Sequence, residues 1–124
     1  MPADHIYSVL IVSASAKFNL AVSTLFPSAQ YWPVDMAENP LSARQKMQEN
    51  SYDIVVINSP LKEETGTRLA ANICSTSSSC VMMLVNKESY DDVSEAVSEY
   101  GVEVIQKLTI YELCMTIIFR LLQF

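Results

Sequence analysis

The stretch "DIVVINSPL", residues 53–61, indicates the centre of an open parallel sheet. Four consecutive apolar residues, 54–57, are typical of a strand that is buried on both faces. The chain then becomes polar at Asn58 and Ser59 and meets Pro60. Ligands of such sheets bind just past the carboxyl ends of the strands, so Asn58 lies where a reactive group is expected. Its amide nitrogen is not a nucleophile, and the function of this position has to be explained.

Four more apolar runs are short enough to be strands, and amphipathic segments separate the five runs. The predicted strands are 8–13, 29–34, 53–58, 80–85 and 102–106. Strands that alternate with helices are typical of a doubly wound α/β domain with a parallel sheet. We therefore predict a flavodoxin-like (βα)5 fold with strand order 2-1-3-4-5, arranged in three layers, α/β/α.

Helix start signals between the runs support this alternation. The segments 89–92 and 109–112 match the S/T-x-x-D/E capping box, whose side chains satisfy free amide groups of the first helical turn. Asn39 before Pro40 predicts a cap followed by a first helical residue. Gly101 predicts the end of the helix that follows the first box.

Length and composition predict a single cytoplasmic domain. A chain of 124 residues that is 50% apolar can bury one core, and we place this domain at 6–124, after a disordered tail at 1–5. A net charge of −6 with eight scattered Lys and Arg residues argues against nucleic-acid binding by this domain. No apolar run is long enough to span a membrane, and the N-terminus does not resemble a signal peptide.

Residue types needed for common catalytic chemistry are missing. Gly66 and Gly101 are the only glycines, which excludes a glycine-rich phosphate cradle. The single histidine, His5, falls in the predicted tail, so a nucleophile–histidine arrangement is not expected. Three cysteines without a C-x-x-C spacing, at 74, 80 and 114, favour small core residues in a reducing compartment. The sequence thus predicts a protein that is not an enzyme and needs no metal or other cofactor.

Four segments in order resemble the receiver domain of two-component response regulators. They are "VLIVSAS", "DIVVINSPLKEETG", "VMMLVNK" and "YGVEVIQK", and the resemblance spans residues 8–122. It implies a phosphorelay signalling module with a phosphorylation site at the carboxyl ends of the strands. The acidic pair that binds magnesium in receivers falls here on Ser13 and Ala14, and the phosphate-accepting aspartate falls on Asn58.

The other family positions are also altered, with one exception. The hydroxyl residue falls on Val85, or on Asn86 if the register slips by one, and the aromatic switch residue falls on Val104. The lysine is present as Lys107, and we expect its amine to pair with Glu63 or to reach solvent. The resemblance therefore implies a pseudo-receiver with a degenerate phosphorylation site.

The leading hypothesis is a module that acts through a protein partner or a homodimer, formed by the last two helices. The candidate interface residues are Tyr90, Tyr100, Tyr111 and Phe119, although the same aromatics could simply complete the core of a monomer. Three segments, "VSAS", "INSPLKEETG" and "KESYDDVSEAVSEYGVEVIQK", are similar to those of bacterial pseudo-receivers that precede ANTAR RNA-binding antiterminator domains. This resemblance implies an output in transcription antitermination that the chain does not contain.

Two alternatives remain open. The emptied pocket around Lys107 could bind a small anion, since an apolar cleft with one cation suits a carboxylate or a phosphate ester. Residual self-phosphorylation is the other alternative, but the residues at 13, 14 and 85 would support neither metal nor phosphate.

Overall fold

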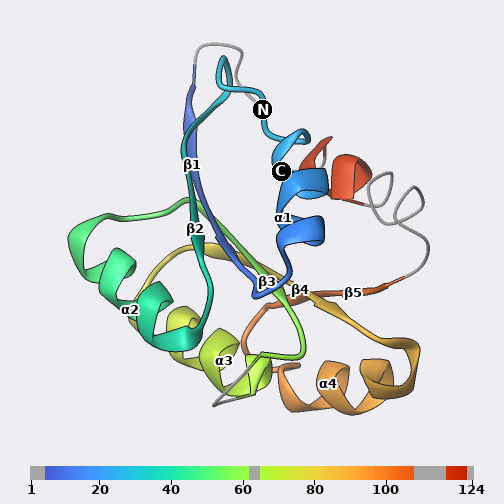
Figure 1. The fold of residues 1–124 in the computed structure, drawn as a ribbon. Coiled ribbons are helices and arrows are strands. Elements are labelled where there is room, and N and C mark those ends of the chain that lie inside the picture. Colours follow the sequence, from blue (N-terminus) through green and yellow to red (C-terminus); the bar gives the residue numbers. More distant parts are fainter. Residues whose placement is uncertain (1–4, 62–64, 108–116, 123–124) are drawn as a thin grey trace.

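The computed structural model describes residues 5–61, 65–107 and 117–122. Five parallel strands form one sheet in the order β2-β1-β3-β4-β5, which confirms the predicted fold class and strand order (Figure 1). The strands are β1 (Tyr7–Val12), β2 (Tyr31–Ala37), β3 (Ile54–Asn58), β4 (Cys80–Val85) and β5 (Glu103–Gln106).

Helices cover both faces of the sheet (Figure 1). One face carries α1 and a helical segment at residues 117–122, and α2, α3 and α4 pack on the other. The bounds are α1 (Ala16–Ser23), α2 (Pro40–Glu49), α3 (Gly66–Thr76), a 3-10 turn η1 (Lys87–Ser89) and α4 (Tyr90–Ala96).

Side-chain alternation along the inner strands builds two cores. In β1, Val9 and Ile11 pack toward α1, whereas Leu10 and Val12 pack toward α2 and α3. All four side chains are fully buried, because a strand in the middle of a parallel sheet has a helical layer on each side. Continuous apolar runs were therefore the correct signal for β1, β3 and β4.

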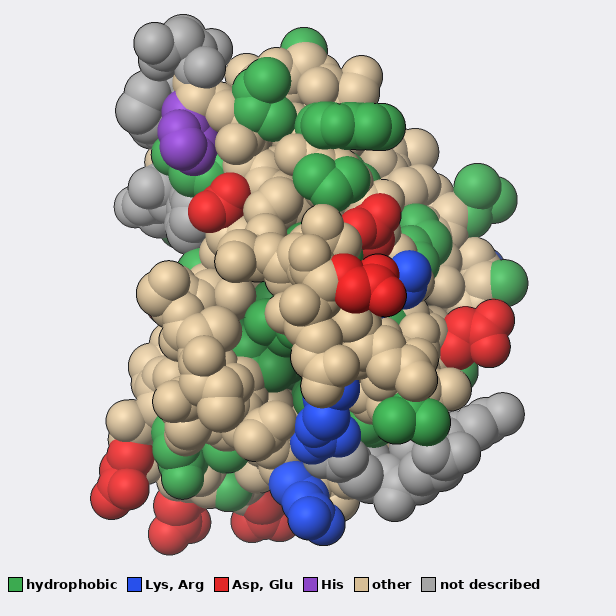
Figure 2. All heavy atoms as spheres, turned by 90° about the vertical axis from the view of Figure 1, so that its left-hand side faces the viewer, with side chains coloured by type: hydrophobic (Ala, Val, Ile, Leu, Met, Phe, Trp, Pro, Cys, Tyr) green, Lys and Arg blue, Asp and Glu red, His purple; other side chains and the backbone are tan. Residues whose placement is uncertain are grey.

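The edge strand β2 departs from the prediction. It covers Tyr31–Ala37 rather than 29–34. Within the described part of the chain, β1 is its only neighbour, so Trp32 and Met36 are exposed and Asp35 is half-buried. Figure 2 views this side of the molecule, where apolar side chains lie scattered among polar ones. An edge strand with a mixed pattern has a weak sequence signal, which explains the shift of its bounds.

Helix caps were predicted with mixed success. Asn39 caps α2 as expected, because its side-chain oxygen accepts a hydrogen bond from the backbone nitrogen of Ser42 at 2.8 Å. The box at 89–92 is wrong: Ser89 already has helical backbone angles at the end of η1 and makes no capping bond. The box at 109–112 lies outside the described residues. Gly101 has a positive φ of 73°, as its predicted role after a helix requires.

The described residues include two of the three cysteines and the single histidine. Cys74 and Cys80 are free, half-buried thiols, and burial raises the pKa of both, whereas Cys114 lies outside the described residues. His5 lies against the ring of Tyr7, with 4.1 Å between the ring centroids. Among the described helices, none is long and apolar enough to cross a membrane.

Candidate functional site

The residues that the family resemblance singles out come together at the carboxyl edge of the sheet. Asn58 is the last residue of β3 and Val85 the last of β4, while Ser13 follows β1 and Lys107 follows β5. Pairing of Val12 with Ile57 in the parallel ladder brings the next residues of those two strands side by side. All four positions therefore lie at the carboxyl edge of the sheet.

Ser13 and Asn58 form a buried hydrogen-bonded pair. The Asn58 Nδ2 group donates to the Ser13 Oγ atom at 3.0 Å, and the two residues are 8% and 0% exposed, respectively. The same hydroxyl oxygen accepts from the backbone nitrogen of Ser15, the residue that caps α1. Asn19 of α1 donates to the Ser13 carbonyl oxygen at 3.4 Å. The Asn58 amide is thus held as a donor to the β1–α1 turn.

The Asn58 Oδ1 atom is buried and has no hydrogen-bond partner within the described part of the chain. Ala14, the second position of the expected acidic pair, is exposed and supplies no ligand oxygen from its side chain. Mg²⁺ prefers carboxylates and near-octahedral oxygen geometry. One neutral amide oxygen with a hydroxyl does not meet this requirement, so the residues at this edge do not fit the metal that receivers use. The described residues also contain no cluster of three or more His, Cys, Asp or Glu side chains that could hold a metal ion.

Val85 and Val104 belong to the core rather than to a polar site. Val85 is fully buried, Val104 is half-buried, and both pack in the cluster that lies under α3 and α4. Tyr90 and Val93 of α4 pack against the same cluster. Asn86, the residue that a register slip would have selected, is exposed beyond the end of β4. The position of the expected hydroxyl is therefore apolar.

Lys107 has a partner that sequence reasoning did not find. Its amine donates a hydrogen bond to the backbone carbonyl oxygen of Ser59, in the turn after β3. The side chain is half-buried, and this burial lowers the pKa of the amine. Glu63, the partner we had expected, lies outside the described residues. A carbonyl acceptor leaves no trace in the sequence, because every residue carries one.

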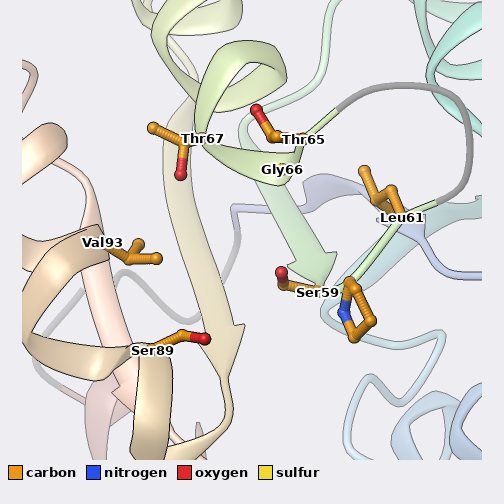
Figure 3. A pocket seen from close by; sticks show the side chains of 8 residues that line it. Ser59, Leu61, Thr65, Gly66, Thr67, Ser89 and Val93 are labelled. Atoms are coloured by element: carbon orange, nitrogen blue, oxygen red, sulfur yellow. The ribbon is translucent and has the colours of Figure 1, made fainter.

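A cavity of about 440 Å³ opens beside this turn (Figure 3). Ser59, Pro60 and Leu61 form one side, the start of α3 forms a second side, and Ser89 and Val93 form the third. Four hydroxyl-bearing residues line it, namely Ser59, Thr65, Thr67 and Ser89. Lys107 is not among the residues that line this cavity.

The four candidate interface residues have different environments. Tyr90 is half-buried and packs against the core, as the monomer alternative expects. Tyr100 and Phe119 are 41% and 61% exposed. Tyr111 lies outside the described residues.

Comparison with known families supports the receiver assignment. The model of the response regulator receiver domain matches residues 9–117. Among solved structures, the response regulator domain of Thermotoga maritima CheB has a TM-score of 0.79 at 19% identity, covering 96% of this chain and 96% of its own. CheY4 of Vibrio cholerae, a chemotaxis response regulator, has a TM-score of 0.76 at 20% identity, covering 93% of this chain and 98% of its own.

A receiver domain from Clostridium thermocellum is also similar, with a TM-score of 0.74 at 19% identity over 93% of this chain and 96% of its own. At such identities, these structures establish the fold alone. Among curated proteins, no sequence matches this chain.

Proposed function

This chain belongs to the response regulator receiver domain family, and we propose that within it the chain is a pseudo-receiver, a signalling module that works through protein contacts without being phosphorylated. One observation carries the proposal. At the end of β3, where the phosphate acceptor is expected, the amide of Asn58 donates to Ser13 inside the protein. The amide has no carboxylate oxygen that could attack a phosphoryl group.

The surroundings of Asn58 support the same conclusion. Phosphoryl transfer depends on a metal ion and donors that offset charge on the equatorial oxygens. Ser13 and Ala14 supply no carboxylate, and Val85 is buried among apolar side chains. Lys107 is the remaining family residue, and its amine already donates to the Ser59 carbonyl. We infer that the protein is not an enzyme and that it uses neither metal nor other cofactor.

The proposed output and setting follow from the resemblance to receivers that precede ANTAR domains. In this proposal, the domain at 6–124 works in the bacterial cytoplasm and regulates an RNA-binding antitermination output. The domain itself does not bind nucleic acid, because its net charge of −6 repels phosphate backbones. Its signal passes through a protein partner or a second copy.

Intact-mass spectrometry after incubation with acetyl phosphate and Mg²⁺ tests the pseudo-receiver proposal. We expect no phosphoryl adduct on the unmodified chain. We also expect none on Asn58→Asp, since this variant still has Ser13 and Ala14 in place of the acidic pair. An adduct on the unmodified chain would overturn the proposal.

Two controls make a negative result informative. An active receiver domain, treated in parallel, must take up one phosphoryl group. The combined variant Ser13→Asp, Ala14→Asp, Asn58→Asp, Val85→Thr restores the family's residue types at all four positions. If this variant folds, as circular dichroism can show, we expect it to be labelled, which would assign the loss of activity to these positions.

A small-anion sensor is the second candidate function, favoured by the cavity beside Ser59. The hydroxyl groups in its mixed lining and the N-terminal end of α3 suit a small polar ligand. Lys107, which we expected to face the anion, does not line this cavity, so the candidate has less support than the pseudo-receiver. Thermal-shift measurements with phosphate, sulfate and carboxylates test it: a rise in Tm that Thr67→Val abolishes would support the sensor, and no rise with any anion would exclude it.

A further inference from the structure

The outer edge of β2 is open to a further strand. Within the described part of the chain, β2 pairs with β1 alone, and an edge strand presents unpaired backbone N–H and C=O groups. The register shift in this pairing lies before Val34. From Val34 to Ala37 each residue of β2 pairs with one residue of β1. This regular segment, residues 34–37, has the extended geometry that strand pairing requires.

The backbone groups of Met36 face away from β1. Ala37 turns its backbone toward β1, since its carbonyl oxygen accepts a hydrogen bond from the Ser13 nitrogen at 2.9 Å. Successive residues of a strand turn their N–H and C=O groups to opposite edges, so Met36 directs its own groups outward. Pro33, which has no N–H, precedes the regular segment and does not interrupt it. The segment can therefore both donate and accept hydrogen bonds.

Side chains along this edge differ between the two faces of the sheet. Val34 packs against the core on the side of α1, and Met36, 37% exposed, pairs in register with Ile11 of that core. Asp35 lies on the other side, because its carboxylate accepts the hydroxyl proton of Tyr52, which packs with α2. The edge is thus apolar toward α1 and acidic toward α2.

More carboxylates surround the acidic side. Glu38 follows β2 directly and is exposed. Burial above all, but also the charges of Asp35 and Glu49, raise the pKa of Tyr52, which places Glu49 near the same hydroxyl. Among the described residues, no basic side chain forms an ion pair with these three carboxylates. In Figure 2, which views this side, acidic side chains lie beside apolar ones.

The basic residues nearby leave this edge acidic. Lys46 is half-buried on α2, while Arg44 turns toward α3, where its Nε donates to Asn72. His5 lies beside Tyr7, whose partner in the ladder is the first residue of β2, so it is far from the regular segment. Three carboxylates against one amine, in a chain of net charge −6, attract a cationic partner.

Trp32 extends the surface that a partner can contact. Its ring is 67% exposed, and it is the only tryptophan of the chain. It lies four residues before Met36, which is about 13 Å along an extended strand. A peptide strand of about six residues covers that distance. Exposed tryptophans are frequent anchors of protein interfaces, and their rings also bind Arg side chains.

We propose that an extended segment of a partner protein, in which basic and apolar residues alternate, adds as a strand to the outer edge of β2. Its apolar side chains lie against Val34 and Met36, and its Arg or Lys side chains face Asp35 and Glu49. This inference rests on the proposed function, because it gives the chemistry of the protein partner. It also moves the expected interface from the last two helices to β2. A second copy does not fit, since its own β2 edge is equally acidic.

Peptides of defined pattern test this proposal. We expect Arg-Val-Arg-Val-Arg-Val to bind with a Kd between about 10 µM and about 1 mM at about 50 mM salt. Binding should shift the Trp32 emission to shorter wavelength, because the peptide covers the ring. Arg-Arg-Arg-Val-Val-Val keeps the charge without the alternation, and Glu-Val-Glu-Val-Glu-Val keeps the alternation with opposite charge. Each should bind at least about tenfold more weakly.

Two results of these titrations would overturn the proposal. Equal affinity for the two arginine peptides would leave only an electrostatic attraction without strand addition. No binding of the alternating peptide at about 1 mM would leave no site for it.

Amide hydrogen exchange locates the peptide. The exchange of the Met36 amide should slow when the alternating peptide binds, whereas the amide of Val12, in a central strand, should not change. Unchanged exchange at Met36 in the complex would contradict strand addition. Exchange at Met36 that slows with rising protein concentration, without peptide, would assign the edge to a second copy and also overturn the proposal.

Matched variants test the chemistry of the edge. Glu49→Gln should weaken peptide binding about two- to fivefold, and Glu95→Gln, at an exposed position of α4, should leave it unchanged. Met36→Pro removes the outward N–H and should abolish binding. Circular dichroism checks that each variant is folded. Equal effects of the two glutamine substitutions would contradict the proposed contact with Glu49.

The outcomes are separable from those of the phosphorylation assay. A chain that takes up no phosphoryl group and binds no peptide would remove the edge site and leave the pseudo-receiver. A chain that binds the peptide and is phosphorylated would remove the pseudo-receiver and leave the edge site.

Discussion

Asn58 donates a hydrogen bond from Nδ2 to the hydroxyl oxygen of Ser13, 3.0 Å away, and thereby links two strands across 45 residues of sequence. In an active receiver, both positions would carry negative charge. Here Asn58 and Ser13 form a neutral, buried pair.

Removing the Ser13 hydroxyl should therefore cost stability. Ser13→Ala leaves the buried Asn58 amide and the Ser15 nitrogen without this acceptor. We expect the free energy of unfolding to fall by about 1–3 kcal/mol, measured by urea denaturation. Ser75→Ala is the control, because its hydroxyl bonds to the Ala71 carbonyl at an exposed site. Equal effects of the two substitutions would contradict a structural role for the pair.

Lys107 should hold the turn after β3 in place. Its amine donates to the Ser59 carbonyl, so Lys107→Met should loosen this turn while keeping the apolar stem packed. We expect faster amide hydrogen exchange at Ser59 and Leu61. Lys46→Met, on α2, is the control and should leave both rates unchanged. Unchanged exchange in Lys107→Met would show that the contact does not stabilise the turn.

Gly66 should resist substitution because α3 begins very close to the sheet. A Cβ atom there would lie 2.7 Å from the Met83 Cε atom and 3.3 Å from the Ile57 Cγ2 atom. Met83 is fully buried, so its methyl group can give way only by a change of side-chain conformation within the core. Gly66→Ala should lower the free energy of unfolding by about 1–3 kcal/mol. Thr67→Ala, one residue further on, should change it by less than about 0.5 kcal/mol; the idea fails if the two are alike.

The stability of the protein should fall above pH 10, in part through Tyr52. This residue is 4% exposed, and its hydroxyl donates to the Asp35 Oδ2 atom at 2.5 Å. Burial, and then the bond to Asp35, raise the pKa of Tyr52 above its usual value of 10.0. The folded state then holds the proton more tightly than the unfolded state. The contribution of the protonated Tyr52 hydroxyl to the free energy of unfolding is complete below pH 10 and is lost as the pH rises further.

Tyr52→Phe isolates this contribution. The variant should lose about 1–2 kcal/mol at neutral pH and show a shallower fall in stability above pH 10. Burial also raises the pKa values of Tyr31, Cys74 and Cys80, but these groups are present in both proteins and cancel in the difference. Tyr100→Phe, at an exposed ring, should match the unmodified protein. Parallel pH profiles for Tyr52→Phe and the unmodified chain would rule out the proposed linkage.

Much of the fold was predictable because its signals are local. Residues 54–57 are apolar without interruption, and the strand they form is buried on both faces. The Asn39 cap was predictable for the same reason, since its acceptor and donor lie three residues apart. The local signal fails at the edge strand β2, which has a neighbouring strand on one side. It also fails at Ser89, because the 3-10 turn η1 directly precedes α4.

The sequence by itself determined the order of strands and helices, the two-sided burial of the central strands, and the absence of carboxylates at positions 13, 14 and 58. These properties depend on residue type and spacing along the chain. Only the tertiary structure decided that Asn58 donates to Ser13 and that Lys107 binds the Ser59 carbonyl. Each of these hydrogen bonds joins residues that are far apart in the sequence, and such contacts depend on how the strands and helices pack together.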